Sequence, residues 1–196
     1  MPLIRKTSDK PQTAATEAKL AGASADARWS AARDSHDVPA LAQALACESE
    51  PRVREALFTA LARVATPEAA AVLLPYIGSD AADIRTGALD ALRAMPEATA
   101  QHLPRLLGDT DADVRLLACD LVRDMPGLEA PRLLCALIET EPQANVCAAA
   151  VEVLTEIGDA SALPALSACA ARFPADPFLS FAIKAAAERI RAASRV

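Results

Sequence analysis

Residues 112–125 read ADVRLLACDLVRDM, and residues 82–95, thirty positions earlier, read ADIRTGALDALRAM. In each stretch an apolar residue and an arginine precede apolar residues that recur every three or four positions, the spacing of one helix face. A third copy begins at Val53, so the repeated arginines are Arg54, Arg85 and Arg115, spaced by 31 and 30 residues. A regular period near 30 residues predicts a helical-repeat solenoid.

Each repeat is predicted to contain two helices. In the repeat around Arg115, the pattern favours a first helix over Glu97–Leu107, a break at Gly108 and a second helix over Asp113–Asp124. A single helical hairpin buries too little apolar surface to be stable alone, whereas stacked hairpins cover one another. Weaker copies of the motif begin at Arg28, Val146 and Leu179.

The composition agrees with helices. Hydrophobic residues make up 53% of the 196 residues and aromatic residues only 3%. Alanine is abundant and has the highest helix propensity, whereas strands are enriched in aromatic and β-branched residues, so we expect an all-α chain. The formal net charge is −6 at pH 7. Because nucleic-acid and anionic-lipid binding need clustered lysine and arginine, this charge argues against both kinds of partner.

On these repeats the sequence resembles the HEAT-repeat family, in the short bacterial form also called the phycobilisome-lyase-type HEAT-like repeat. The resemblance covers about residues 25–192 and is strongest in DIRTGALDALRAM and DVRLLACDLVRDM. It implies an α-α superhelix, a HEAT-repeat solenoid of about five helical hairpins. We therefore expect a HEAT-repeat domain over residues 23–196, preceded by a flexible N-terminal tail over residues 1–22.

The resemblance also implies a structural role for the repeated arginines. In the family, an aspartate six residues before this arginine ties the turns of neighbouring repeats together. Here Asp109 stands six residues before Arg115, and Glu48 stands six residues before Arg54, whereas a serine precedes Arg85 at that distance. We use the name arginine ladder for Arg54, Arg85, Arg115, Asp109 and Glu48. The arginine is missing at Cys147 and Ser180, so the ladder is expected to weaken toward the C-terminus.

The two ends of the array carry aromatic residues. Trp29 is expected to cover the open face of the first complete hairpin, and Phe173, Phe178 and Phe181 are expected to close the other end. Alternatively, these side chains anchor a partner protein.

The five cysteines lie in helical stretches rich in alanine and leucine, and no CxxC pattern occurs. We interpret them as small buried hydrophobic residues of a reducing compartment, with a ligand-binding thiol at Cys119 or Cys147 as the alternative. The N-terminus has no secretory h-region, and no run approaches the roughly 18 apolar residues of a membrane span. The expected location is therefore cytoplasmic.

The outward positions of the second helices are expected to line the concave inner surface of the superhelix. Aligned from the motif position, they form an acidic column beside a short basic one: Asp90, Arg93, Asp120, Arg123, Glu152 and Glu156. One interpretation is a solvated face, because two acid–arginine pairs have the i,i+3 spacing of a single helix. The other is a binding surface for a protein or peptide with a basic segment, clearest at the two glutamates.

Catalytic and metal-binding patterns such as HExxH, GxGxxG or the P-loop do not occur in the sequence. Ser35, His36 and Asp37 are consecutive, but a triad is defined by geometry, so we interpret them as a helix-initiating turn. Neither a metal nor a cofactor is expected.

Two functions of different classes remain. The first is a non-catalytic protein-interaction scaffold or accessory factor that binds a partner through the concave face. The second follows only from the resemblance, since relatives attach or detach bilin chromophores on phycobiliprotein cysteines: a bilin lyase-type chromophore attachment subunit. No residue here matches a catalytic motif of those relatives, so the sequence leaves open whether the chain is an enzyme.

Overall fold

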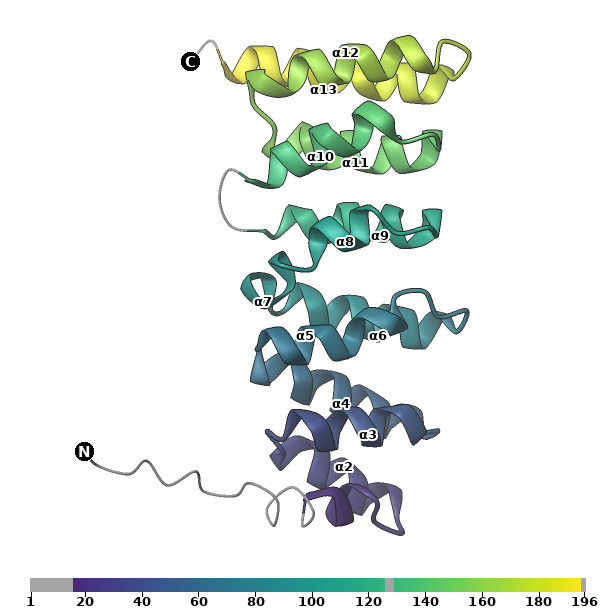
Figure 1. Ribbon diagram of the computed structural model, residues 1–196, viewed down its shortest axis with the longest axis vertical. Coiled ribbons are helices and arrows are strands. Elements are labelled where there is room, and N and C mark those ends of the chain that lie inside the picture. Colours follow the sequence, from purple (N-terminus) through teal and green to yellow (C-terminus); the bar gives the residue numbers. More distant parts are fainter. Residues whose placement is uncertain (1–15, 126–128, 195–196) are drawn as a thin grey trace, which may run out of the picture. The chain divides into compact units, whose positions relative to one another are not determined.

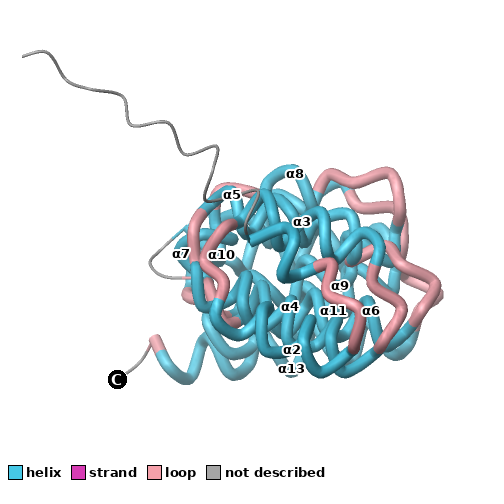
Figure 2. Tube along the Cα trace, turned by 90° about the horizontal axis from the view of Figure 1, so that it is seen from below, coloured by secondary structure: helices cyan, strands magenta, loops and turns pink. Residues whose placement is uncertain are grey.

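The structure is a computed structural model that describes residues 16–125 and 129–194, and helices are its only regular elements in these ranges (Figure 1). The chain divides into two compact units, Met1–Met95 and Pro96–Val196. We call them unit 1 and unit 2 and describe each by itself. The all-α expectation is confirmed, and loops join the helices throughout (Figure 2).

Unit 1 is built from stacked hairpins in two layers. Its elements are α2 (Ala25–Asp34), α3 (Val38–Cys47), α4 (Pro51–Val64), α5 (Pro67–Leu73), the 3₁₀ turn η1 (Leu74–Tyr76) and α6 (Ala82–Arg93). The second helix α4 packs between α2 and α6, and the first helices α3 and α5 contact each other. Each hairpin therefore covers its neighbour, as the period of the sequence predicts.

Unit 2 repeats this arrangement. Its elements are α7 (Pro96–Ala100), α8 (Leu103–Leu107), α9 (Ala112–Arg123), α10 (Glu129–Thr140), α11 (Ala144–Ile157), the 3₁₀ turn η2 (Ala160–Ala162), α12 (Leu163–Arg172) and α13 (Pro177–Ala193). The second helix α11 packs between α9 and α13, and the first helices α10 and α12 contact each other. Among the described residues, unit 1 has two complete hairpins, α3–α4 and α5–α6, preceded by α2, and unit 2 has three. This agrees with the prediction of about five.

The predicted first helix over Glu97–Leu107 is wrong in one respect, because the structure divides it into α7 and α8. Proline has no backbone N–H and its ring clashes with the preceding turn, so Pro104 would kink or break a helix in its interior but is tolerated in a first turn. The chain therefore begins a new helix at Leu103, with Pro104 in its first turn.

The predicted apolar stripes form the core. In α9 the side chains of Val114, Ala118, Leu121 and Val122 are buried, and Leu117 is half-buried. The equivalent stripe of α11 is buried at Val146, Ala150, Val153 and Leu154. These helices pack closely because alanine recurs on the buried faces.

Polar residues start several helices as the sequence indicates. The side chain of Thr66 accepts a hydrogen bond from the backbone N–H of Ala69 at the start of α5. Asp37, the last residue of the Ser35–Asp37 turn, caps α3 in the same way. The helix-initiating interpretation of that turn is confirmed.

The proposed tail over residues 1–22 lies partly outside the described residues. Residues 16–20 are helical, and the side chain of Leu20 is only 4% exposed. Residues 1–15 are not described, so the boundary between a tail and a repeat domain at residues 22 and 23 stays a prediction.

Phe178 and Phe181 do not cover the core at the end of the array, although we expected them to do so. Their side chains are 86% and 75% exposed, because both face away from the core side of α13. Trp29 is half-buried, and the guanidinium groups of Arg33 and Arg52 each lie 4.6 Å from its ring centroid. Among the described residues, no helix combines the length and apolar character that a membrane crossing requires.

Candidate functional site

Two of the repeated arginines share one kind of backbone contact. Arg85 donates a hydrogen bond of 2.6 Å to the carbonyl of Ser79, and Arg115 donates one of 2.9 Å to the carbonyl of Asp109. Arg28, in the weak early copy, reaches the equivalent carbonyl of Gly22 at 3.2 Å. For these three arginines the partner is the backbone carbonyl six residues earlier, which explains why the side chain at that position can vary. Arg54 instead uses the carbonyl of Ser49, five residues earlier.

The acidic side chain at the same position pairs with the preceding repeat. Both carboxylate oxygens of Glu48 bind Arg28, at 2.7 and 3.0 Å, rather than Arg54. Both carboxylate oxygens of Glu141, six residues before Cys147, bind Arg115 at 2.7 and 2.8 Å. These bidentate pairs join neighbouring repeats within each unit.

The pairs Arg28–Glu48 and Arg115–Glu141 differ from surface ion pairs because their side chains are largely buried. The side chains of Arg115 and Glu141 are 12% and 2% exposed. The guanidinium of Arg115 lowers the pKa of Glu141, and that of Arg28 lowers the pKa of Glu48, because each hydrogen-bonded pair favours the ionised carboxylate. The two carboxylates also accept backbone N–H groups of their own turns.

The remaining members of the arginine ladder have other side-chain contacts. Arg54 donates to the carbonyl of Ser49 at 2.8 Å and to the carboxylate of Asp83, in the next repeat, at 2.6 Å. The carboxylate of Asp109 accepts the backbone N–H of Asp111. These contacts are structural in kind, since each one fixes a turn or joins two turns.

The repeat with Cys147 at the motif position lacks the arginine, and Arg172 of the following hairpin supplies a guanidinium in its place. The thiol of Cys147 lies 3.6 Å from the carbonyl of Glu141, the same carbonyl position that the arginines use. Arg172 of α12 donates to this carbonyl at 3.1 Å and to the carbonyls of Ile138 and Glu139 at 2.6 and 2.7 Å. The turn before α11 is therefore bound from the following hairpin.

The six residues of the predicted binding columns fall into two groups, one in each unit. In unit 1, Arg93 donates to Asp90 at 2.8 Å across one helical turn, and the Asp90 side chain is 63% exposed. In unit 2, four residues of α9 and α11 form what we call the Arg123 cluster: Asp120, Arg123, Glu152 and Glu156.

The Arg123 cluster has an excess of negative charge. The guanidinium of Arg123 contacts Asp120 at 3.4 Å, Glu152 at 3.7 Å, and Glu156. Three carboxylates and one guanidinium give a formal charge of −3 + 1 = −2. Glu152 is the most exposed member, at 73%. The predicted acidic column thus contains an ion-pair network that also joins α9 to α11.

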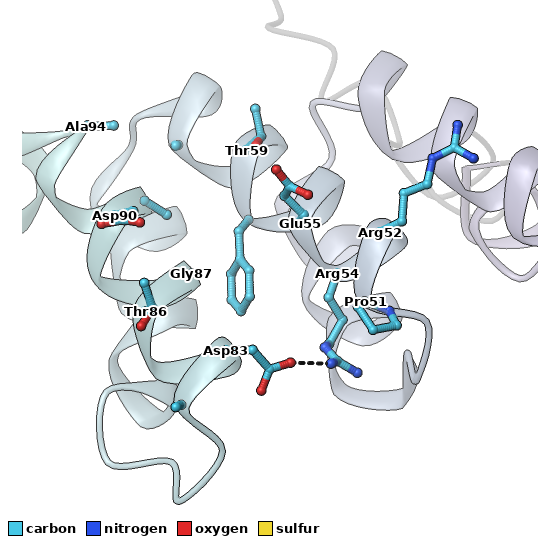
Figure 3. Close-up of a pocket in the computed structure, with 14 residues that line it drawn as sticks. Pro51, Arg52, Arg54, Glu55, Thr59, Asp83, Thr86, Gly87, Asp90 and Ala94 are labelled. Atoms are coloured by element: carbon cyan, nitrogen blue, oxygen red, sulfur yellow. Dashed lines mark hydrogen bonds and ion pairs between the residues drawn. The ribbon is translucent and has the colours of Figure 1, made fainter.

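A groove of about 820 Å³ lies between the second helices α4 and α6 of unit 1 (Figure 3). We call it the α4–α6 groove. Its lining residues are Pro51, Arg52, Arg54, Glu55, Phe58, Thr59, Ala62, Ala82, Asp83, Thr86, Gly87, Asp90, Ala91 and Ala94. Asp90 is the one member of the predicted columns that lines it.

The apolar part of the groove depends on Phe58 and Gly87. The Phe58 ring is buried and contacts Tyr76 edge to face, with the ring centroids 6.2 Å apart. A Cβ atom at Gly87 would lie 2.6 Å from Cδ2 of Phe58, so only glycine leaves room for the ring in this position. The small residues Ala62 and Ala91 also line the groove.

Charged and hydroxyl side chains border the groove (Figure 3). The guanidinium of Arg54 lowers the pKa of Asp83 through their hydrogen bond, which closes one end of the groove. Glu55 and Thr59 of α4 are exposed at the opening. Glu55 has no ion-pair partner among the described residues, so its carboxylate is available to a ligand.

The cysteines differ in exposure. Cys119, Cys147 and Cys169 are buried, Cys135 is half-buried and Cys47 is exposed. Burial raises the pKa of the Cys119 thiol and of the Cys147 thiol to about 12. In residues 16–125 and 129–194, no three histidine, cysteine, aspartate or glutamate side chains converge as metal ligands do.

Sequence reasoning assigned no site role to four residues that the structure brings into these contacts. Arg28 and Glu141 belong to the inter-repeat pairs, and their signal was present, since Glu141 stands six residues before the degenerate motif position. Glu55 and Phe58 line the groove, but no local pattern distinguishes them from any other exposed acid or core aromatic residue.

No protein-family model matches this chain, and no curated protein sequence matches it. Solved structures do resemble it. One is a chain of a structure that describes the structural basis of microtubule plus end tracking by XMAP215, CLIP-170 and EB1. Its sequence identity to this chain is 15%, and its TM-score is 0.58, with 89% of each chain covered.

Two designed or engineered proteins are also similar. The designed armadillo repeat protein YIII(Dq)4CqI has 15% identity and a TM-score of 0.45, with 90% of this chain and 98% of that chain covered. An engineered protein has 19% identity and a TM-score of 0.46, covering 92% and 97%. At such low sequence identities, structural similarity shows the fold alone. Together with the stacked hairpins, the first match shows that the chain has a HEAT-like helical-repeat fold.

Proposed function

We propose that the chain is a non-catalytic protein-interaction module that binds a segment of a partner protein along its second helices. The observation that carries this proposal is the α4–α6 groove, which lies between two second helices and is lined by both apolar and polar residues. Solenoids commonly bind partners along the surface that their stacked repeats create. The arginine ladder and the two buried pairs hold this surface in shape.

The chemistry of the groove favours a partner segment with a basic residue beside an apolar one. The two arginines that line the groove already have ion-pair partners, because Arg54 binds Asp83 and Arg52 binds Asp26. The acids Glu55 and Asp90 are exposed at the opening, where Asp90 also accepts a hydrogen bond from Arg93. A lysine or arginine of the partner would meet them, while a neighbouring apolar side chain would cover Phe58.

In unit 2, the Arg123 cluster is a second candidate contact for basic charge. Its formal charge of −2 and the exposure of Glu152 leave carboxylate oxygens open to solvent. Rim charges of this kind alter the association rate and its salt dependence more than the affinity. We assign the cluster this supporting role and the groove the main one. The chain's net charge of −6 is unfavourable for nucleic acid or an anionic membrane as the partner.

Affinity capture from the producing cell with matched variants tests this function. The test variant is Glu55→Lys, and the control is Glu139→Lys on the first helix α10. Both residues are exposed helical glutamates, and both substitutions change the net charge by the same amount. The bound proteins are then compared by quantitative mass spectrometry.

We expect one protein to be recovered with the wild type and with Glu139→Lys and to be about tenfold depleted with Glu55→Lys. Both variants should keep the helical circular-dichroism spectrum and the melting temperature of the wild type, because neither side chain is in the core. Equal recovery of every partner with both variants would show that the groove is not the binding surface.

A further inference from the structure

The N-terminal residues of the chain have the chemistry that the α4–α6 groove favours. Residues 3–6 read LIRK, so two apolar residues directly precede two basic ones. Residues 1–15 contain three basic residues and one acidic residue, a formal charge of +2. Since the whole chain has 20 basic and 26 acidic residues, residues 16–196 carry a formal charge of 17 − 25 = −8. The N-terminal segment and the rest of the chain are therefore oppositely charged.

The α4–α6 groove offers a complementary surface. Glu55 is exposed at its opening and has no ion-pair partner among the described residues. The Asp90 side chain is 63% exposed and pairs with Arg93 across one helical turn. Phe58 and Ala91 line the same groove. A segment with apolar residues beside basic ones would therefore find a contact for each kind of side chain.

The groove is closed at one end and open at the other. The ion pair between Arg54 and Asp83 joins the first turns of α4 and α6 (Figure 3). Thr59 and Ala94 lie toward the opposite end (Figure 3). Ala62, near the C-terminal end of α4, lines the groove as well. A segment of chain would therefore enter the groove from the side where α4 and α6 end.

The described chain begins on this same side of unit 1. Thr16 lines a hollow of about 860 Å³ together with Thr66, which follows the last residue of α4 by two positions. Ile4 precedes Thr16 by 16 − 4 = 12 positions, and 12 residues span up to about 40 Å. Helix α4, with 14 residues, is only about 21 Å long. Residues 3–6 can thus reach every part of the groove.

From this agreement in charge, chemistry and reach we infer that residues 3–6 occupy the α4–α6 groove of their own chain. The apolar pair Leu3 and Ile4 covers Phe58, and Arg5 or Lys6 meets the carboxylate of Glu55. The inference rests on the proposed function in one respect, namely that the groove takes a segment with basic and apolar residues. A partner segment then binds only after it displaces the chain's own N-terminal segment.

The strength of this competition follows from the short tether. Four side chains make a contact far smaller than a standard interface, so as a separate peptide the segment should bind with a dissociation constant of roughly 100 µM. A tether of about ten residues supplies an effective concentration of about 1 mM. Because this concentration is about ten times the dissociation constant, the apparent affinity of any competing peptide should fall about tenfold.

Fluorescence anisotropy tests the inference with a labelled peptide of residues 1–12 as the probe. The peptide is titrated with full-length chains, from about 10 µM to about 1 mM. The test variant is Arg5→Glu with Lys6→Glu, which removes the basic residues of the chain's own segment. The control is Lys184→Glu with Arg189→Glu, two exposed residues of α13 in unit 2. Both double substitutions change the net charge equally, so general attraction of a basic peptide rises equally in both.

The site is located by a further substitution in the test variant. Glu55→Lys is added to one sample and Glu139→Lys, on α10 of unit 2, to another. Both side chains are exposed, and both substitutions change the net charge by the same amount.

We expect the test variant to bind the peptide about tenfold more tightly than the wild type or the control does. Adding Glu55→Lys should abolish most of this binding, whereas adding Glu139→Lys should leave it nearly unchanged. A peptide that binds none of the chains would overturn the inference. Equal affinity for the test variant and the control would do the same, and so would equal effects of Glu55→Lys and Glu139→Lys.

The outcome is separable from that of the proposed function, because the probe is the chain's own peptide and not the cellular partner. If the peptide does not bind but Glu55→Lys still depletes the captured partner, the inference fails and the proposed function stands. If the peptide binds in the groove but partner capture is unchanged by Glu55→Lys, the inference stands and the proposed function fails.

Discussion

At the level of single residues, one position in each turn serves several neighbours at once. For Arg28, Arg85 and Arg115, the residue six positions earlier supplies the backbone carbonyl that the arginine binds. When it is glutamate, its carboxylate binds the arginine of the preceding repeat and caps its own turn, as Glu141 does. Both carboxylate oxygens of Glu141 are therefore hydrogen-bonded at a site that is 3% exposed.

Replacing Glu141 by glutamine should destabilise the protein by about 3 kcal/mol, because the guanidinium of Arg115 would lose its carboxylate in a buried place. Asp90→Asn removes an exposed pair within one helix and should change the unfolding free energy by no more than about 0.5 kcal/mol. Urea denaturation measures both. Similar effects of the two substitutions would refute the distinction drawn here between buried and exposed pairs.

The same pair predicts how stability depends on pH. The pKa values of Glu141 and Glu48 are lower in the folded than in the unfolded chain, so the folded state binds fewer protons at these groups. Their contribution is complete above the ordinary glutamate pKa of 4.5 and is lost as the pH falls through the folded pKa values.

Melting curves between about pH 3 and pH 7 should therefore show the wild type losing its advantage over Glu141→Gln below about pH 4.5. A difference between the two proteins that does not change across this range would mean that the Glu141 charge adds nothing to stability.

At the level of the helix, α4 ends in a conformation that its sequence disfavours. Ala65 follows the last turn with a φ of 52°, in the left-handed region, and its N–H donates to the carbonyl of Leu61. An L-residue with a side chain pays for this conformation roughly 1–2 kcal/mol, whereas glycine does not.

Ala65→Gly should accordingly stabilise the protein by about 0.5–1 kcal/mol, since part of the gain is offset by the greater freedom of glycine in the unfolded chain. Ala65 is exposed, so packing does not change. Differential scanning calorimetry should show a higher melting temperature; a lower one would mean that the left-handed turn is not occupied in solution.

The helix boundaries show where local sequence is sufficient. The second helix predicted over Asp113–Asp124 is found at Ala112–Arg123, because its apolar period lies within the segment and the acidic N-cap Asp111 directly precedes it. The first helix predicted over Glu97–Leu107 is divided, because the apolar period continued through Pro104 and concealed its effect. The exposed phenylalanines of α13 were also misjudged, since hydrophobic character alone does not say which side of a terminal helix is covered.

At the level of the whole molecule, each unit is two layers of helices in which a repeat depends on its neighbours. Leu121 lies in the second-helix layer of unit 2 and is 3% exposed. Leu121→Ala should cost about 2–5 kcal/mol, because the cavity cannot collapse between stacked hairpins. Equilibrium urea unfolding measures the loss. A cost below about 1 kcal/mol would show that the hairpins are not closely packed at this point.

The repeat period alone predicts this architecture, but it predicts the candidate site only in part. The positions of Asp90 and Glu152 on second helices follow from counting along the motif. The groove between α4 and α6 does not, because it depends on the absence of a side chain at Gly87 and on the rotamer of Phe58 in a neighbouring repeat. Phe58 and Gly87 are 29 positions apart, and neither the sequence around Phe58 nor the sequence around Gly87 predicts their contact.

The central claim, that a partner lies along the second helices, can be tested most directly with a photoreactive amino acid. It is introduced at Thr59, which lines the α4–α6 groove, and separately at Ala71, which is exposed on the first helix α5 of the same unit. After irradiation in the producing cell, crosslinked peptides are identified by mass spectrometry. We predict a single partner peptide containing a basic residue, crosslinked at Thr59 and absent at Ala71. A partner captured at Ala71 and not at Thr59 would contradict the claim.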